Sequence, residues 1–182
     1  MITLNSCPIC DSRCTVRQMI VETWPHIRHE IMPGVEVDAA LLTYFFTCQN
    51  CHVVFQNPRL SDEELNRFYS EGFYRRMLDT TDEKIDQDES YRAKIDSEII
   101  KQHVGNINSH LDIGCSRGYL LEAVGADTKV GVESNISYVT ASDVKVYSEI
   151  NQVAHKSFDL LTAIHILEHV SDPVGFLKKW LD

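Results

Sequence analysis

The stretch from Leu111 to Leu121, LDIGCSRGYLL, restricts the fold of this chain more than any other. It reads as an apolar strand, a tight turn of small residues and the start of a helix. Gly114 and Gly118 let the backbone turn sharply and approach a ligand without a side-chain collision. Free N–H groups at the following helix start attract negative charge. The stretch therefore predicts a ligand-binding turn in an α/β protein.

Short apolar runs and helical patterns alternate around this turn. The predicted strands are His110–Ile113, Val130–Val132, Val144–Tyr147 and Phe158–Ile164. The predicted helices are Tyr119–Val124, Ser137–Ala141 and Val174–Leu181. Alternation of this kind predicts right-handed crossovers and a parallel sheet covered on both faces. We expect a partial sheet of about four strands.

A nicotinamide or flavin dinucleotide is the first ligand to consider for the turn. If Gly114 began a G-x-G-x-x-G pattern, Ser116 and Tyr119 would occupy the second and third glycine positions. Pyrophosphate approach and close helix packing require glycine there. A ligand with an adenosine but no pyrophosphate fits better.

The turn resembles the first motif of the class I S-adenosylmethionine-dependent methyltransferases, an acidic residue followed by Gly-x-Gly-x-Gly. Asp112, Gly114, Ser116 and Gly118 stand at those positions. Glu133 ends the second strand, where the family has a ribose-binding acid. A carboxylate can accept two hydroxyl hydrogen bonds at once and so suits a vicinal diol.

Residues 158–173, FDLLTAIHILEHVSDP, resemble the family's fourth strand and the loop after it. The resemblance implies a Rossmann-like fold and S-adenosylmethionine as cofactor. The residues it implies for cofactor binding are Asp112, Gly114, Cys115, Ser116, Gly118, Tyr119, Glu133, Ser134 and His165. Ser148 and Glu149 are candidates for a contact with the adenine. The alternative is that the two glycines only make a turn in another α/β protein and that Glu133 is a solvated strand-end carboxylate.

Two C-x-x-C pairs lie near the N-terminus, formed by Cys7, Cys10, Cys48 and Cys51. This spacing lets two thiolates reach one tetrahedral metal from a single tight turn, so the four residues predict a closed structural zinc site. Chance cysteines or disulfides are the alternative. Cys14 and His52 are competing ligands, because a Cys-for-His exchange is chemically feasible, but we expect neither to bind, since the two pairs already complete the tetrahedron. Asp11 and His52 follow the two pairs where glycine is common, and both residue types tolerate positive φ.

Residues 44–69 resemble the zinc-binding leader found ahead of many bacterial methyltransferases, several of which modify sugars or surface-polysaccharide precursors. We expect a zinc-ribbon domain at 1–60, a helical linker or cap at 61–108, and the N-terminal half of a methyltransferase domain at 109–182. Capping boxes at Ser61–Glu64 and Thr80–Glu83 predict two helix starts, the second helix running to about His103. Tyr69 and Tyr74 are candidates for covering the cofactor.

Methyl transfer to a hydroxyl or a carbon requires alignment of donor and acceptor and removal of a proton. The resemblance places the acceptor past the fourth strand, where His165, Glu168 and His169 are the candidate catalytic residues. Histidine suits the role because its unperturbed pKa lies near 6.5. The alternatives are that these side chains seat the cofactor's methionine part, hydrogen-bond the loop, or hold a divalent ion.

Charge and hydropathy restrict the partners. The chain has 17 Lys and Arg against 27 Asp and Glu, a net charge of −10, which disfavours nucleic acid. No apolar run approaches the roughly 20 residues that span a bilayer, and the start has no signal-peptide pattern, so we expect a cytoplasmic protein.

The methyltransferase family continues with three more strands after the fourth. We therefore expect a truncated domain whose exposed sheet edge offers a route to homo-oligomers. The predicted function is methyl transfer to a small molecule such as a sugar or polysaccharide precursor. The alternative is a non-catalytic zinc-ribbon module that binds S-adenosylmethionine and mediates protein–protein interaction.

Overall fold

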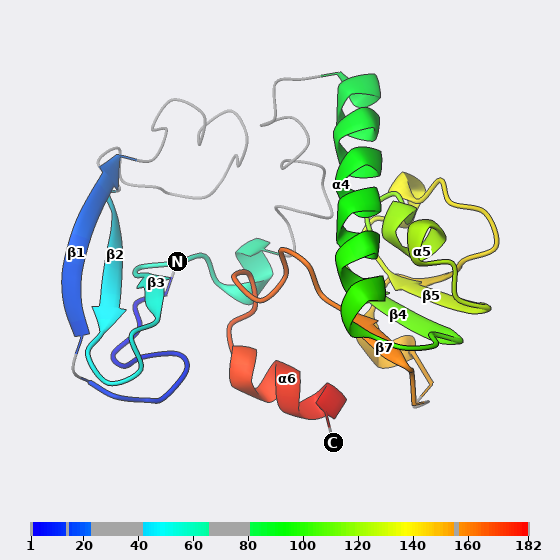
Figure 1. The fold of residues 1–182 in the computed structure, drawn as a ribbon. Helices are drawn as coiled ribbons and strands as arrows, with labels where there is room; N and C mark the ends of the chain where they lie inside the picture. The colour runs from blue at the N-terminus through cyan, green and yellow to red at the C-terminus, as the bar shows by residue number, and fades with distance from the viewer. Residues whose placement is uncertain (1, 14, 23–41, 66–80, 155–156, 182) are drawn as a thin grey trace. The chain divides into compact units, whose positions relative to one another are not determined.

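The computed structural model describes residues 2–13, 15–22, 42–65, 81–154 and 157–181 (Figure 1). The chain divides into two compact units, one of Met1–Leu78 with Glu168–Asp182 and one of Asp79–Leu167. Each unit has its own sheet, antiparallel in the first and parallel in the second. Among the described helices, none is both long and apolar enough to cross a bilayer.

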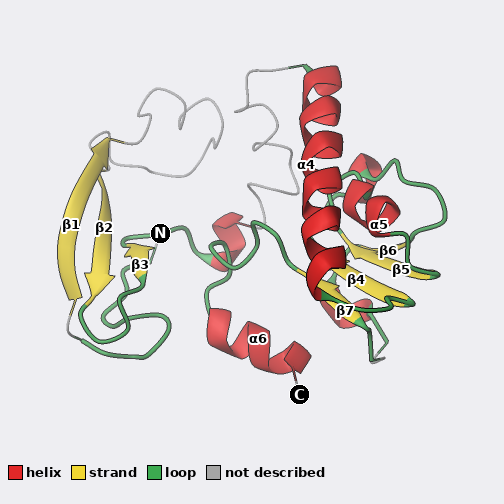
Figure 2. Ribbon diagram, in the orientation of Figure 1, coloured by secondary structure: helices red, strands yellow, loops and turns green. Residues whose placement is uncertain are grey.

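The first unit is built on a three-stranded antiparallel sheet in the order β1-β2-β3 (Figure 2). The strands are β1, Thr15–Glu22, β2, Leu42–Cys48, and β3, Val54–Gln56. Phe46 and Phe55 face each other across β2 and β3, with stacked rings whose centroids lie 6.1 Å apart. Aromatic pairs of this kind stabilise a small sheet through area and geometry together.

Residues near the N-terminus are joined to the segment after β3. Asn57 accepts a hydrogen bond from the Leu4 N–H and donates one to the Leu4 carbonyl, both at 2.8 Å. Ile2 and Arg59 form a two-bond antiparallel bridge at 2.8 and 3.0 Å. These bonds fix the start of the chain beside the exit from the sheet.

Two predicted helix features of the first unit are confirmed. Ser61 and Glu64 form the reciprocal capping box, since the Ser61 N–H donates to Glu64 Oε2 at 2.7 Å and the Glu64 N–H donates to Ser61 Oγ at 3.3 Å. Helix α6, Pro173–Leu181, forms where the sequence predicts it, one residue earlier than expected.

The second unit contains a four-stranded parallel sheet in the order β6-β5-β4-β7. Its strands are β4, Ser109–Ile113, β5, Thr128–Val132, β6, Lys145–Tyr147, and β7, Leu160–Thr162. Helix α4, Asp82–His103, packs against α5, Tyr119–Val124, and α5 lies against β4 and β5. An α/β unit with four parallel strands is therefore confirmed.

β4 is one of the two inner strands of this sheet, paired with β5 on one side and β7 on the other. Leu111 in β4 and Leu121 in α5 are fully buried, so the core lies between this strand and the helix that follows it. Asp159 fixes the start of the pairing with β7, because its Oδ2 accepts the N–H groups of Asn108 and Ser109 at 2.8 and 2.9 Å. Those bonds hold the pKa of Asp159 below its usual range.

Three expectations about elements are wrong in detail. The helix predicted at Ser137–Ala141 is a single 3₁₀ turn, Ile136–Tyr138, followed by a segment in which the N–H groups of Thr140 and Ala141 bond to the carbonyl of Arg117. Strand β7 is shorter than the predicted 158–164. The cap of α4 is Thr81, whose Oγ1 accepts the Lys84 N–H, and the predicted Thr80 lies outside the described residues. Tyr69, Tyr74 and Cys14 also lie outside them.

Candidate functional site

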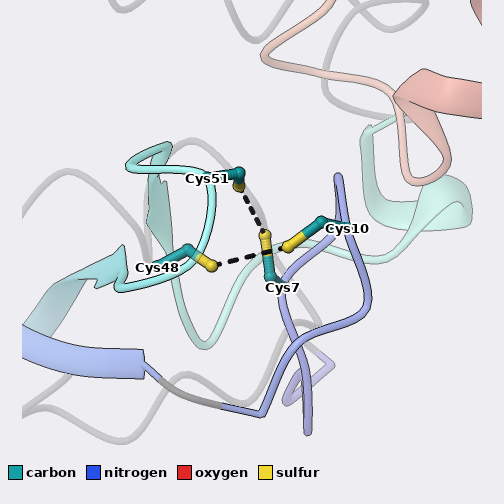
Figure 3. Close-up of side chains that lie close together, drawn as sticks. All are labelled: Cys7, Cys10, Cys48 and Cys51. Carbon is teal, nitrogen blue, oxygen red and sulfur yellow. Dashed lines mark hydrogen bonds between the residues drawn. The ribbon is translucent and has the colours of Figure 1, made fainter.

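The four predicted metal ligands come together in the first unit (Figure 3). The Sγ atoms of Cys7 and Cys51 lie 3.6 Å apart, as do those of Cys10 and Cys48, and all four sulfurs lie within 4.8 Å of one another. A disulfide would need about 2.05 Å. Four zinc–thiolate bonds of about 2.3 Å in a tetrahedron separate their sulfurs by roughly 3.8 Å, so the observed spacing fits a zinc ion.

The two halves of the site have the same backbone turn. The Asp11 N–H donates to the Cys7 carbonyl at 3.0 Å, and the His52 N–H donates to the Cys48 carbonyl at 2.9 Å. Asp11 and His52 have positive φ, 56° and 61°. The prediction that these residues take the conformation usual for glycine is therefore confirmed, and we call the two turns the cysteine knuckles, residues 7–12 and 48–53.

Hydrogen bonds to sulfur prepare the knuckles for a metal. The backbone N–H groups of Ile9 and Asn50 donate at 3.4 Å to the sulfurs of Cys7 and Cys48. Asn50 also links the two knuckles, because its Nδ2 donates at 3.4 Å to Cys10 Sγ. Donors aimed at sulfur stabilise thiolate, the form that binds metal.

The four thiols differ in how readily they ionise, because their neighbours lower the pKa of Cys10 and raise that of Cys51. The Asn50 amide and the Ser12 backbone lower the pKa of Cys10 to about 6. Although the Val53 N–H works in the opposite direction, burial and the neighbouring thiols raise the pKa of Cys51 to about 12. Four thiolates this close require a positive ion between them, and the cluster could hold a zinc ion in that place.

Among the described residues, the cysteine quartet is the one group of three or more side chains suited to a metal ion. His52 is exposed and does not belong to it. Within the described residues, all five cysteines are free thiols, so the disulfide alternative does not apply to them. Cys14, the other predicted competitor, lies outside the described residues.

The second candidate site is the turn after β4, which we call the glycine loop, residues 114–118. Gly114, Ser116 and Gly118 all have positive φ, at 76°, 46° and 86°. The Gly114 N–H donates to the Val132 carbonyl at 2.8 Å, which fastens the loop to the end of β5. The loop therefore sits at the carboxyl ends of two adjacent parallel strands, where open α/β sheets bind ligands.

The Glu133 carboxylate lies against the glycine loop. Its Oε2 accepts the Ser116 N–H at 3.1 Å, and its Oε1 accepts the Asn135 N–H at 3.0 Å. The Ser134 hydroxyl donates to the same Oε1 at 3.2 Å. The loop and the predicted ribose-binding acid thus meet in space, although 17 positions separate Ser116 from Glu133 in the chain.

Helix α4 adds a carboxylate that the sequence did not reveal as a site residue. The Ser116 hydroxyl donates to both carboxylate oxygens of Glu89, at 3.2 and 3.0 Å. Beside it, Arg117 lies 3.5 Å from Asp82 and 3.1 Å from Asp86. These acids recur at about one-turn intervals along α4, so one helix face clamps the loop. Helical periodicity identifies that face, but only the fold shows what it meets.

The glycine positions are required by packing as well as by any ligand. A Cβ at Gly118 would lie 2.6 Å from the Cβ of Ala141, and a Cβ at Gly114 would overlap the side chain of Ile166. A Cβ at Gly131 in β5 would lie 2.6 Å from Cys115 Sγ. A bulky residue at Gly118 would therefore disturb the fold, so it does not test ligand approach alone.

The remaining predicted cofactor residues have defined surroundings. Cys115 is buried, and burial raises the pKa of its thiol, so it packs as a neutral group. Tyr119 begins α5 and packs against a small core of Ala93, Leu120 and Val124. Beyond β6, Gln152 Oε1 accepts the hydroxyl of Ser148 and the N–H of Glu149, both at 3.2 Å.

Asp112 is buried in β4, two positions before Gly114, where the loop begins. Its Oδ1 accepts the hydroxyl of Thr162 in β7 at 2.6 Å, and Thr162 Oγ1 lies 2.7 Å from His110 Nε2. Burial raises the pKa of Asp112 to about 7, opposed by the bond from Thr162 and assisted by the charge of Glu133. Burial also lowers the pKa of His110 to about 4. Sequence reasoning found Asp112 but neither of its neighbours.

The three candidate catalytic residues divide between the two units. His165 belongs to the second unit, is exposed and has φ of 56°. Glu168 and His169 belong to the first, where His169 Nε2 lies 4.0 Å from Glu168 Oε1. Arg59 anchors that segment by donating to the carbonyls of Val170 and His169 at 2.9 and 3.0 Å. Glu168 and His169 therefore lie on a segment fixed to the unit that contains the knuckles.

Comparisons with known proteins add nothing to this geometry. No protein-family model matches the chain, and no curated protein is significantly similar to it. A function therefore has to be inferred from the chemistry of the two sites.

Proposed function

We propose that this protein is a class I S-adenosylmethionine-dependent methyltransferase with a zinc-ribbon leader and a Rossmann-like sheet. The observation that carries the proposal is the bond from the Ser116 N–H to Glu133 Oε2 at 3.1 Å. It joins the glycine loop to a strand-end carboxylate able to accept both hydroxyls of a ribose.

Charge around the loop favours this ligand over a nucleotide. The Glu133 carboxylate accepts the Ser116 N–H, and the Glu89 carboxylate accepts the Ser116 hydroxyl. A phosphate bound at this loop would need those same donors and would lie beside two negative charges. Asp112 lies close behind, within electrostatic range of Glu133. These carboxylates would repel a phosphate, whereas they attract the positive charges of a sulfonium and an ammonium. S-adenosylmethionine carries both cations, together with a diol.

The cysteine knuckles serve as a structural zinc site in this proposal. Their four ligands complete a tetrahedron and leave no open position for catalysis. A unit with so small a sheet gains from the metal the stability that its core lacks.

On the acceptor side, His165, Glu168 and His169 remain the candidates for removing a proton. The proposed acceptor is a hydroxyl or carbon of a small molecule such as a sugar or polysaccharide precursor. For such an acceptor, the sulfonium supplies most of the activation, and the protein aligns the two partners and takes the proton.

Calorimetry on the folded, zinc-loaded chain tests the proposal. We expect S-adenosylmethionine and S-adenosylhomocysteine to bind, and NAD⁺ and ATP to give no heat. Glu133→Gln should weaken binding about tenfold or more, because one charge-assisted hydrogen bond contributes about 1.5–3 kcal/mol.

Glu98→Gln is the matched control, since it makes the same change of charge at an exposed position of α4. It should bind as the unaltered chain does. The proposal fails if neither adenosyl ligand binds the unaltered protein, or if Glu133→Gln and Glu98→Gln bind equally well.

A further inference from the structure

Three polar side chains form a hydrogen-bonded chain inside the parallel sheet. His110 and Asp112 are two positions apart in β4, so their side chains lie on the same face of the sheet. Thr162 in β7 is the strand partner of Asp112. Thr162 Oγ1 lies 2.7 Å from His110 Nε2 and 2.6 Å from Asp112 Oδ1. The exposed fractions are 0%, 4% and 8% for His110, Asp112 and Thr162, so water does not screen these bonds.

When Asp112 is ionised, the number of hydrogens determines the direction of this chain. Thr162 has one hydroxyl hydrogen, and when that hydrogen goes to an ionised Asp112, the bond to His110 needs an Nε2–H donor. Neutral histidine then has a bare Nδ1, and Nδ1 is buried without a hydrogen-bond partner. An unpaired buried polar atom costs about 1–3 kcal/mol, so an orientation retained at that cost indicates a role for His110 beyond packing.

We infer that His110 and Thr162 are positioning residues that favour the ionised form of Asp112 and orient its carboxylate beside the glycine loop, where its charge contributes to binding a cationic ligand. The inference rests on the proposed function for the ligand, and on the structure alone for the chain of hydrogen bonds. Asp112 lies two positions before Gly114, the first residue of the loop, and within electrostatic range of Glu133 and of the Cys115 thiol.

The groups that face Asp112 can be named element by element. On its own strand it has neutral His110, on β7 Thr162, in the glycine loop the neutral Cys115 thiol, and after β5 the Glu133 carboxylate. Glu133 is the charged group among them, and it opposes ionisation of Asp112. The hydrogen bond donated by Thr162 favours ionisation of Asp112, so loss of that bond should raise the pKa of Asp112.

The pH dependence follows from that sign. The pKa of Asp112 is about 7, so a fall in pH through neutrality puts a proton on the carboxylate and removes a negative charge from the site. Affinity for S-adenosylmethionine should then fall. Thr162→Val keeps the shape of the side chain but removes the donor, so the midpoint should move about one pH unit higher. Thr162→Ser retains the hydroxyl and should keep the original midpoint.

His110 acts through Thr162, so its variants should follow the same direction with a smaller shift. His110→Phe removes the Nε2–H that polarises the Thr162 hydroxyl, and the midpoint should rise by a fraction of a pH unit. His110→Gln supplies a replacement amide donor, so its midpoint should lie closer to that of the unaltered protein than the midpoint of His110→Phe does.

The experiment has two readouts on the full, zinc-loaded chain. The first is the ¹³C shift of the Asp112 carboxyl against pH in ligand-free protein, with the amide spectrum as the check of folding. The second is the dissociation constant of S-adenosylmethionine against pH. Titration of the ligand itself is common to every variant and cancels in the comparison.

The two readouts separate failure of this inference from failure of the proposed function. A carboxyl midpoint that rises in Thr162→Val and stays in Thr162→Ser supports the hydrogen-bonded chain even if S-adenosylmethionine does not bind. An unchanged midpoint in folded Thr162→Val overturns it, even if the ligand binds normally. An unchanged midpoint in His110→Phe alone removes His110 from the positioning role.

Discussion

Removal of zinc should unfold the sheet of the first unit and leave the parallel sheet folded. The four sulfurs of the cysteine knuckles lie within 4.8 Å of one another, and the sheet of the same unit has three strands. Structural zinc contributes about 10–16 kcal/mol in small zinc-binding peptides at pH 7. The free energy of unfolding of a whole domain is only about 5–15 kcal/mol. The free energy lost with the metal is therefore larger than a small core can offset.

Hydrogen exchange followed by mass spectrometry, with and without a strong chelator, measures this. Peptides from β1, β2 and β3 should lose protection, and peptides from β4, β5 and α5 should keep theirs. Metal analysis of reduced protein should give about one zinc per chain. Cys10→Ser should lower that content, and Cys115→Ala, in the other unit, should not. Protected β1–β3 peptides in protein shown to be free of metal would refute the reasoning.

Two further predictions concern contacts within each unit. Arg59→Ala removes the donors that bond to the carbonyls of His169 and Val170, so hydrogen exchange in peptides covering 168–176 should speed up about tenfold. Arg59→Lys should show a smaller effect. An unchanged exchange rate in Arg59→Ala would contradict the anchoring. Gly131→Ala places a Cβ 2.6 Å from Cys115 Sγ and should destabilise the unit by about 1–3 kcal/mol in denaturant unfolding. Adding Cys115→Ala should recover much of that loss, whereas strictly additive losses would show that the two residues do not clash.

Local patterns in the sequence account for the features that were predicted well. The knuckles depend on residues within one turn, and Asp11 and His52 take positive φ as their types allow. Helix α5 was predicted with its observed bounds, and Gly118 and Gly125 at its two ends both take the left-handed conformation. Such signals lie within a few residues and need no knowledge of the fold.

Features that depend on distant partners were missed. The 3₁₀ turn at Ile136–Tyr138 does not continue into a helix, because the next N–H groups bond to the Arg117 carbonyl. The contact of Glu89 with Ser116 spans 27 positions, and that of Thr162 with Asp112 spans 50. Strand register and helix packing create these pairs, and neither can be read from one sequence.

A crystal structure of the chain with S-adenosylhomocysteine bound tests the central claim most directly. We predict that the ribose hydroxyls donate to the Glu133 carboxylate and that the ligand runs along the backbone from Gly114 to Gly118. Density for the ligand at any other place, with this loop empty at saturating ligand concentration, would contradict the account.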